Sequence, residues 1–304
     1  MTDDSQSAEE VLTEITAPRT WWGVSAVFWR RYLLLAMMFG LALITGNPLF
    51  LLLFGGPALV SFFWDRSSTR ALASWCTYAA TFVAFVLLRM YADDYGPPAT
   101  WQYAATFDGW LAGGVLPTIA LQRAFYDPAT PHWWDWLGVA IYQTHYFCTP
   151  AVGILVWRFR PALLRRYLLA ISLVYWIGLV IHWLIPTVPP WLASLNGDLP
   201  ESYRPLWHIL GGITPELYRA GVEALDRNTV AAMPSMHTAA AAMVACVAWS
   251  GPRWVRILGM LYPILMLLTL VYFAEHYVID GIVGVALVLP TWRWIGGQES
   301  LQSG

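Results

Sequence analysis

Six long apolar stretches limit what this chain can fold into. They lie near residues 71–92, 137–157, 167–186, 236–250, 257–274 and 277–295. A helix that crosses the hydrocarbon core of a bilayer needs about 20 apolar residues, and most of the stretches approach that length. Apolar residues make up 58% and charged residues 12% of the 304 residues, about half the charged fraction of a soluble protein. We therefore expect an all-α, polytopic membrane protein with a six-helix core.

A further apolar region, residues 32–63, precedes these six stretches and is interrupted by Gly-Asn-Pro at 46–48. Each half has about 15 residues, which is short for a full membrane crossing. The region can form two short membrane helices or a re-entrant hairpin, and both alternatives leave its two ends on the same side. We expect an N-terminal membrane hairpin over 31–64, followed by the six-helix transmembrane domain over 70–296.

The beginning of the chain is polar and acidic. The first 20 residues contain five acidic residues and no apolar stretch. A cleavable signal peptide needs an apolar segment, so we expect residues 1–30 to form a cytoplasmic tail instead. The net charge of −2 provides no basic surface for nucleic acid, which we exclude as a partner.

All 17 basic residues are arginines, and their distribution predicts the orientation of the chain. Cytoplasmic loops of membrane proteins are enriched in arginine and lysine. With the amino terminus in the cytoplasm, 12 of the 17 arginines face that side, including the four between residues 158 and 166. The two long connections, 93–136 and 187–234, then face outward, and their seven tryptophans indicate contact with the headgroup layer. We expect a multi-pass protein of the cell membrane.

The histidines all lie in these outward connections or in the outer halves of the apolar stretches: His132, His145, His182, His208, His237 and His276. Ionisable groups at membrane depth are costly and usually face a polar cavity. The clustering therefore predicts a single polar pocket that opens to the exterior. His132 and His208 can instead be interfacial residues outside that pocket, because they lie in the aromatic-rich connections.

Residues 275–280 place an imidazole and a carboxylate four positions apart. At that spacing two side chains share one face of a helix. The carboxylate of Asp280 can then accept the Nδ1 proton of His276. This leaves Nε2 of His276 unprotonated and able to act as a nucleophile.

A second polar segment opens another apolar stretch, where Pro234 and Ser235 precede His237. The amide groups in the first turn of a helix have no intrahelical partner, and the helix dipole favours an anion there. Ser235 and these amides can bind phosphoryl oxygens, and His237 can donate a proton to the leaving oxygen. Each segment alone is common by chance. Together they open two spans at the same face, and the pair predicts a catalytic site for phosphoryl transfer. This site has one carboxylate and no cluster of metal ligands, so we expect neither a metal nor a cofactor.

The two segments resemble the second and third signature motifs of the type 2 phosphatidic acid phosphatase (PAP2) superfamily, Pro-Ser-Gly-His and Ser-Arg-x5-His-x3-Asp. The six apolar stretches are similar to the six-helix core of that superfamily. The resemblance implies that His276 is the nucleophile that forms a phosphohistidine and that Asp280 orients it. It also implies that His237 is the general acid and that Ser235 contacts the phosphoryl oxygens.

Three departures from the superfamily motifs indicate a particular branch. Met236 replaces the glycine of the second motif, Thr269-Leu270 replace the Ser-Arg of the third, and the first motif, Lys-x6-Arg-Pro, is absent. Together with Pro-Pro-Trp at 189–191, these features resemble the inositol phosphorylceramide synthase branch, whose members transfer a phospho-alcohol headgroup between lipids. A phosphodiester carries less charge than a monoester, so the loss of two cationic contacts fits a diester substrate.

A few other residues are candidate substrate contacts. Arg123, Arg204 or Arg227 can replace the missing arginine, and Arg227 is favoured because it lies eight residues before Ser235. His145 and His182, in the outer halves of their stretches, can each line the pocket or donate to a neighbouring backbone carbonyl. Asp108 and Asp135, in the first outward connection, are candidate polyol-binding groups.

Three functional hypotheses remain open. The leading one is a membrane lipid phosphotransferase that moves a phospho-alcohol headgroup, with phosphoinositol as one candidate, from a phospholipid donor to a lipid alcohol acceptor. A lipid phosphate phosphatase, in which water is the acceptor, would use the same residues. The third is a non-catalytic lipid-binding membrane protein with a vestigial site. Product analysis separates the first two, and replacement of His276 separates both from the third.

Overall fold

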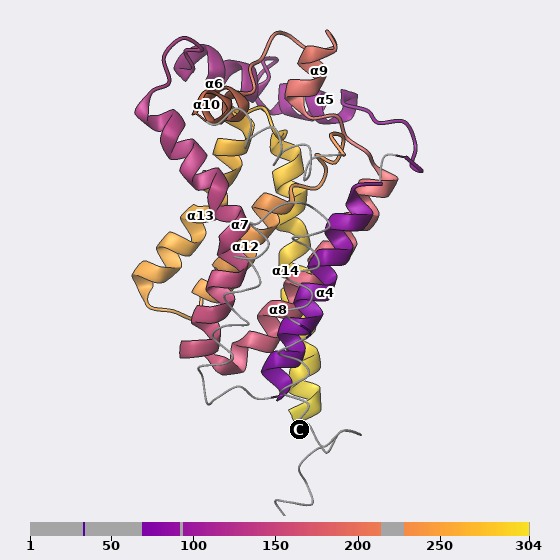
Figure 1. The fold of residues 1–304 in the computed structure, drawn as a ribbon, viewed down its shortest axis with the longest axis vertical. Helices are drawn as coiled ribbons and strands as arrows, with labels where there is room; N and C mark the ends of the chain where they lie inside the picture. Colours follow the sequence, from indigo (N-terminus) through magenta and orange to yellow (C-terminus); the bar gives the residue numbers. More distant parts are fainter. Residues whose placement is uncertain (1–32, 34–68, 92–93, 214–227, 304) are drawn as a thin grey trace, which may run out of the picture.

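The computed structural model describes residues 33, 69–91, 94–213 and 228–303 (Figure 1). The tail 1–30 and nearly all of the hairpin expected over 31–64 lie outside the described residues. Arg227, a candidate substrate contact, lies outside them as well.

Within the described ranges, six apolar helices form a bundle (Figure 1): α4 (Thr69–Arg89), α7 (Trp133–Phe159), α8 (Pro161–Leu184), α12 (Met236–Ala248), α13 (Arg253–Tyr272) and α14 (Val278–Ser303). Five of them are long and apolar enough to cross a membrane, and α12 is a shorter apolar helix. The six helices correspond to the six apolar stretches of the sequence. The expectation of an all-α, polytopic membrane protein is confirmed.

Helix α12 lies in the middle of the bundle, where it packs against α7, α8, α13 and α14. Its buried face consists largely of alanines: Ala239, Ala240, Ala241, Ala242, Ala245 and Ala248. Small side chains allow helix backbones to approach closely in a membrane protein, where packing rather than water exclusion drives association. The composition of α12 therefore explains how one short helix can contact four others.

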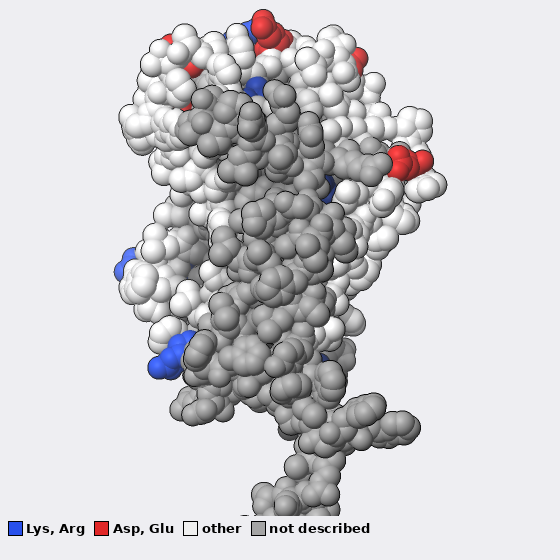
Figure 2. Space-filling model, in the orientation of Figure 1, with Lys and Arg blue, Asp and Glu red and all other residues white. Residues whose placement is uncertain are grey.

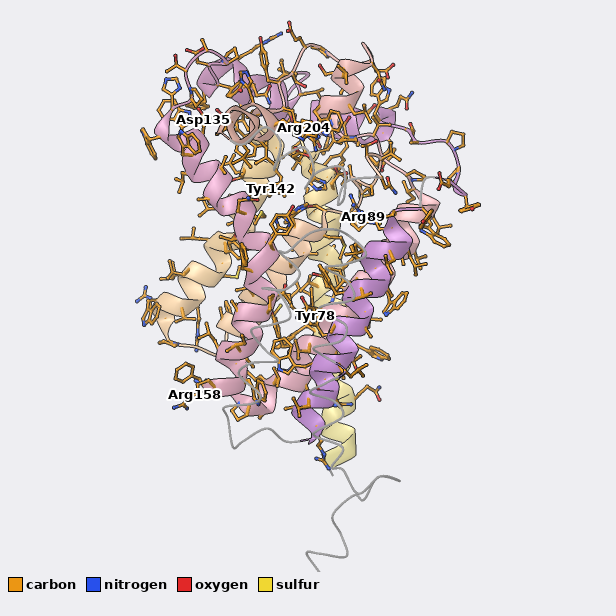
Figure 3. All side chains as sticks on the ribbon, viewed as in Figure 1. Tyr78, Arg89, Asp135, Tyr142, Arg158 and Arg204 are labelled. Carbon is orange, nitrogen blue, oxygen red and sulfur yellow. The ribbon has the colours of Figure 1, made fainter. Side chains whose placement is uncertain are left out.

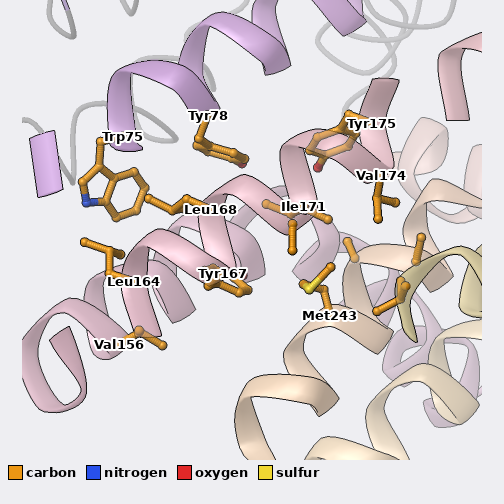
Figure 4. Close-up of a cluster of buried hydrophobic side chains, with 14 of the residues drawn as sticks. Trp75, Tyr78, Val156, Leu164, Tyr167, Leu168, Ile171, Val174, Tyr175 and Met243 are labelled. Carbon is orange, nitrogen blue, oxygen red and sulfur yellow. The ribbon is translucent and has the colours of Figure 1, made fainter. Parts of the chain in front are cut away.

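An aromatic cluster joins α4 to α8 (Figure 4). Trp75 and Tyr78 of α4 are almost fully buried against Tyr167 and Tyr175 of α8. The Tyr167 hydroxyl donates to the carbonyl of Thr149 in α7 at 3.1 Å, so this buried polar group is satisfied. The cluster fixes three helices relative to one another.

In the part of the chain that the structure describes, four short helices cover one end of the bundle, opposite the carboxyl terminus (Figure 1): α5 (Gln102–Leu111), α6 (Pro117–Phe125), α9 (Pro190–Leu195) and α10 (Pro205–Ile213). We call them the cap. They come from the two long connections, which therefore lie at the same end of the molecule. The first connection is shorter than expected, because α7 already begins at Trp133. On the face shown in Figure 2, acidic side chains gather towards the cap end, and the described sides of the bundle are mostly uncharged.

Candidate active site

Three histidines meet just below the cap. His237 comes from the first turn of α12, His276 from the short connection between α13 and α14, and His145 from α7. The ring centroids of His237 and His276 are 5.4 Å apart, and those of His145 and His237 are 4.1 Å apart. Figure 3 shows Tyr142, one turn before His145, below the level of Asp135 and Arg204, whereas Arg158 lies at the other end of the bundle.

Asp280 lies directly behind His276. Its Oδ2 is 3.3 Å from Nδ1 of His276 and accepts the backbone N–H of Tyr277 at 2.9 Å. Asp280 has no solvent exposure and His276 is 5% exposed. The expectation that these two side chains share a helix face needs correction, because α14 begins at Val278 and His276 precedes it. The contact still forms, since Asp280 belongs to the first turn of that helix.

The two imidazoles face each other through Nε2 of His276 and Nδ1 of His237, which are 3.3 Å apart. A consistent assignment of protons follows from the partners of each ring. When Nδ1–H of His276 donates to Asp280, its Nε2 is an acceptor, and Nδ1 of His237 must be the donor. The arrangement places an unprotonated nitrogen of His276 opposite a proton donor of His237.

Ser235 is the N-cap of α12. Its hydroxyl oxygen accepts the backbone N–H of Thr238 at 3.3 Å and the Thr238 hydroxyl at 3.0 Å. Such a cap satisfies one of the unpaired amides at the start of a helix. The Ser235 N–H donates to the carbonyl of Asp280 at 2.9 Å, so the first turns of α12 and α14 are tied together.

The close approach of α12 to α14 depends on Gly284. A Cβ atom at this position would lie 2.4 Å from the carbonyl oxygen of Ser235. The obstacle is backbone, which cannot rotate away as a side chain can. Only glycine therefore allows His237 and His276 to come as near as they do.

His145 lies beside His237. Its Nδ1 donates to the carbonyl of Tyr142 at 2.5 Å, so Nε2 is left as the acceptor nitrogen of this ring. The ring of Tyr142 is also near, with its centroid 5.2 Å from that of His237. His237 is therefore flanked by His276 on one side and by two rings of α7 on the other.

Arg204 does not take the place of the missing motif arginine. It forms a bidentate ion pair with Glu275, in which Nε lies 2.7 Å from Oε1 and Nη2 lies 2.9 Å from Oε2. Its guanidinium also lies over the rings of Trp191 and Trp207, at 4.1 and 4.8 Å from their centroids. The pair was not predicted from the sequence, although Glu275 directly precedes His276.

The position of the motif arginine itself is apolar. Leu270 is completely buried and packs with Ala241 and Met266. Its carbonyl accepts the backbone N–H of Glu275 at 3.0 Å and that of His276 at 3.4 Å. Leu270 thus supports, through its backbone, the segment that carries His276.

Three other sequence candidates have structural partners. Asp135 accepts the backbone N–H of His132 at 2.7 Å and the Tyr272 hydroxyl at 2.5 Å. Asp108 accepts two backbone amides of α14. Both carboxylates are buried and engaged within the protein, which does not support the polyol-binding interpretation.

Nε2 of His182 donates to the carbonyl of Pro234 at 3.3 Å, just before the second motif. Among the residues that the structure describes, no group of three or more His, Cys, Asp or Glu side chains could hold a metal ion.

The fold and the site together define an integral membrane protein with a buried His–His–Asp arrangement at one end of a helical bundle. A sequence model described as the PAP2 superfamily matches residues 117–294, which is more than half of the chain. The chain therefore belongs to the PAP2 superfamily. The matched range includes His145, His237, His276 and Asp280. Searches of curated proteins and of solved structures found no match. Membership of this superfamily supports a lipid phosphatase or phosphotransferase type of function.

Proposed function

We propose that the protein is a membrane lipid phosphotransferase that works through a phosphohistidine intermediate. The observation that carries the proposal is the 3.3 Å contact between Nε2 of His276 and Nδ1 of His237, with Asp280 behind His276. The donor is a phospholipid and the acceptor is the hydroxyl of a second lipid, with phosphoinositol as a candidate for the transferred group.

In the first step, Nε2 of His276 attacks phosphorus. A nitrogen–phosphorus bond forms, the bond from phosphorus to the donor-lipid oxygen breaks, and that oxygen takes the Nδ1 proton of His237, which enters this step as the imidazolium and leaves it neutral. The Asp280 carboxylate stabilises the positive charge that develops on the imidazole of His276. In the second step, His237 accepts the proton of the acceptor hydroxyl as its oxygen attacks phosphorus, and the nitrogen–phosphorus bond breaks.

The geometry requires one movement. Attack begins when Nε2 of His276 is about 3 Å from phosphorus. A hydrogen bond from Nδ1 of His237 to the leaving oxygen takes up about 3 Å more. The two nitrogens must therefore be roughly 6 Å apart when a phosphoryl group lies in line between them. The nitrogens are 3.3 Å apart. His276 is held by Asp280 and by the backbone of Leu270. The His237 side chain therefore moves away from His276 when the substrate enters.

The loss of the motif arginine favours a phosphodiester. Leu270 stands where the motif has arginine, and Arg204 is paired with Glu275. With these cationic contacts missing, the single charge of a diester is easier to stabilise than the charge of nearly two on a monoester. This supports headgroup transfer over hydrolysis of a lipid phosphate.

The Pro-Pro-Trp segment supports the inositol phosphorylceramide synthase branch. These residues begin α9, and the backbone N–H of Trp191 donates to the carbonyl of Ala274 at 3.1 Å, two residues before His276. A branch-specific segment thus touches the segment that carries the nucleophile. The arginine distribution supports an extracytoplasmic position for this end of the bundle, where the cap would meet the outer leaflet.

The decisive experiment follows the phosphoryl group. The purified protein is reconstituted in vesicles with phospholipid labelled at phosphorus and with a lipid alcohol. The proposal predicts that label appears in a second lipid, and that His276→Ala abolishes the transfer. His208→Ala, an exposed histidine of the cap, is the matched control and should retain it. Label found only in water-soluble products would identify a hydrolase, and unchanged turnover in His276→Ala would reject the proposal altogether.

A further inference from the structure

Asp108 belongs to α5 in the cap, but its carboxylate reaches the helix that follows the nucleophile. Oδ2 accepts the backbone N–H of Val278 at 2.8 Å, and Oδ1 accepts that of Ile279 at 3.2 Å. These are amides of the first turn of α14, which have no partner within their own helix. The negative charge is also favoured by the positive end of the helix dipole. Asp108 is only 1% exposed, so water does not compete for these bonds.

Two carboxylates therefore accept the backbone amides at the start of α14. Asp108 takes the amides of Val278 and Ile279. Asp280 takes the amide of Tyr277 through Oδ2 and directs the same oxygen at His276. The carboxylate of Asp280 is available to His276 because another acid caps the two amides nearest to it.

We infer that Asp108 is a positioning residue for the nucleophile His276, acting from the cap through the start of α14. This inference rests on the proposed function. Without the Asp108 carboxylate, two buried amides lose their acceptor, and an unsatisfied buried donor is costly. Asp280 is the nearest carboxylate on the same helix turn, and it turns towards these amides and away from His276. The imidazole then loses its orientation.

The acid–base behaviour of Asp108 adds a second consequence. Burial, with a smaller contribution from the nearby charge of Asp280, raises the pKa of the Asp108 carboxyl to about 6, although the two amides oppose this shift. Tyr277 also faces Asp108, and Tyr103 and Asp198 lie around Tyr277. Protonation below about pH 6 removes the charge that holds the two amides. Activity should therefore fall along an acid limb near this pH.

The test compares Asp108→Asn with Asp127→Asn in the transfer assay. Asparagine keeps the size of the side chain and one acceptor oxygen, but it points an N–H₂ group at one of the amides. We expect kcat to fall roughly 10- to 100-fold, as for a small displacement of a reacting group, with little change in KM. The pH profile of kcat in Asp108→Asn should lack the acid limb near pH 6. Asp127 is exposed in the same connection and caps only the N–H of Ala129, so its variant should behave as the wild type.

Each result has a defined meaning. If Asp108→Asn keeps the wild-type kcat and its acid limb, the inference is wrong. If the variant does not fold, the wild-type profile decides, and a kcat that stays constant from about pH 7 to about pH 5 rejects the inference. If His276→Ala is as active as the wild type, the proposed function has failed instead. The activity of His276→Ala is measured without any change at Asp108, so the two failures can be told apart.

Discussion

Arg204 and Glu275 form a bidentate ion pair directly beside His276, and the Arg204 guanidinium lies over the rings of Trp191 and Trp207. The two side chains are 14% and 9% exposed. The pair joins the cap to the connection between α13 and α14. It therefore fixes the segment that carries the proposed nucleophile, and it keeps a cation close to the site without presenting it to a phosphate.

Glu275→Gln tests this pair. The variant leaves the charge of Arg204 without its carboxylate partner in a mostly buried place, and breaking a buried pair from one side costs about 3 kcal/mol. We expect the free energy of unfolding to fall by about that amount in denaturation experiments in detergent micelles. Glu201→Gln is the matched control, because Glu201 is an exposed acid in the same connection. A Glu275→Gln variant as stable as this control would show that the pair does not hold the cap in place.

Gly284→Ala tests the close approach of α12 and α14. The new Cβ would lie 2.4 Å from the carbonyl oxygen of Ser235, so the two helices must separate. Overpacking of this kind costs about 1–3 kcal/mol, and we expect transfer activity to fall at least tenfold because the first turns of α12 and α14, which position His237 and Asp280, shift relative to each other.

The control for this variant is Gly297→Ala on the same helix, where a Cβ meets no atom within 4 Å. Thermal unfolding and initial rates of transfer are measured for both variants. Equal rates for the two alanine variants would show that the distance between α12 and α14 does not set the activity.

A substitution at Ala274 is expected to raise the stability of the protein, whereas Glu275→Gln and Gly284→Ala lower it. Ala274 has φ of +60° two residues before His276, and it is completely buried. A non-glycine residue in the left-handed region costs about 1–2 kcal/mol. We expect Ala274→Gly to raise the free energy of unfolding by up to about 1 kcal/mol, because the strain is relieved while the unfolded chain gains some freedom.

Ala240→Gly, in the interior of α12, is the matched control for Ala274→Gly. The same substitution there should lower stability by about 1 kcal/mol, because glycine is unfavourable inside a helix. Denaturation curves of the two variants should therefore move in opposite directions. A loss of stability in both would mean that Ala274 is not strained.

The sequence predicted much of the bundle, because each membrane helix is encoded by a local run of apolar residues. It also indicated that His276 and Asp280 meet, since they are separated by four residues, although the helix begins only at Val278. The short helices of the cap were not predicted, because their apolar residues follow no membrane-length pattern.

Most of the supporting contacts of the site had no signal in the sequence. Arg204 and Glu275 are 71 positions apart, and Asp108 and Val278 are 170 positions apart. No local periodicity connects residues so distant, and only the packing of the cap on the bundle brings them together. Arginine and aspartate in a polar connection are also common without any such role. One signal was present in Glu275, an acid at the end of an apolar stretch, where a buried charge requires a partner.

The most direct test of the central claim is to trap the covalent intermediate. The protein is mixed with phospholipid labelled at phosphorus, quenched with denaturant within one turnover, and the label on the chain is located by peptide mapping. We expect an acid-labile, base-stable label on His276 that is absent from His276→Ala and that accumulates in the wild-type protein when the acceptor alcohol is withheld. A labelled residue other than His276, or transfer to the acceptor lipid with no labelled protein at any time, would contradict it.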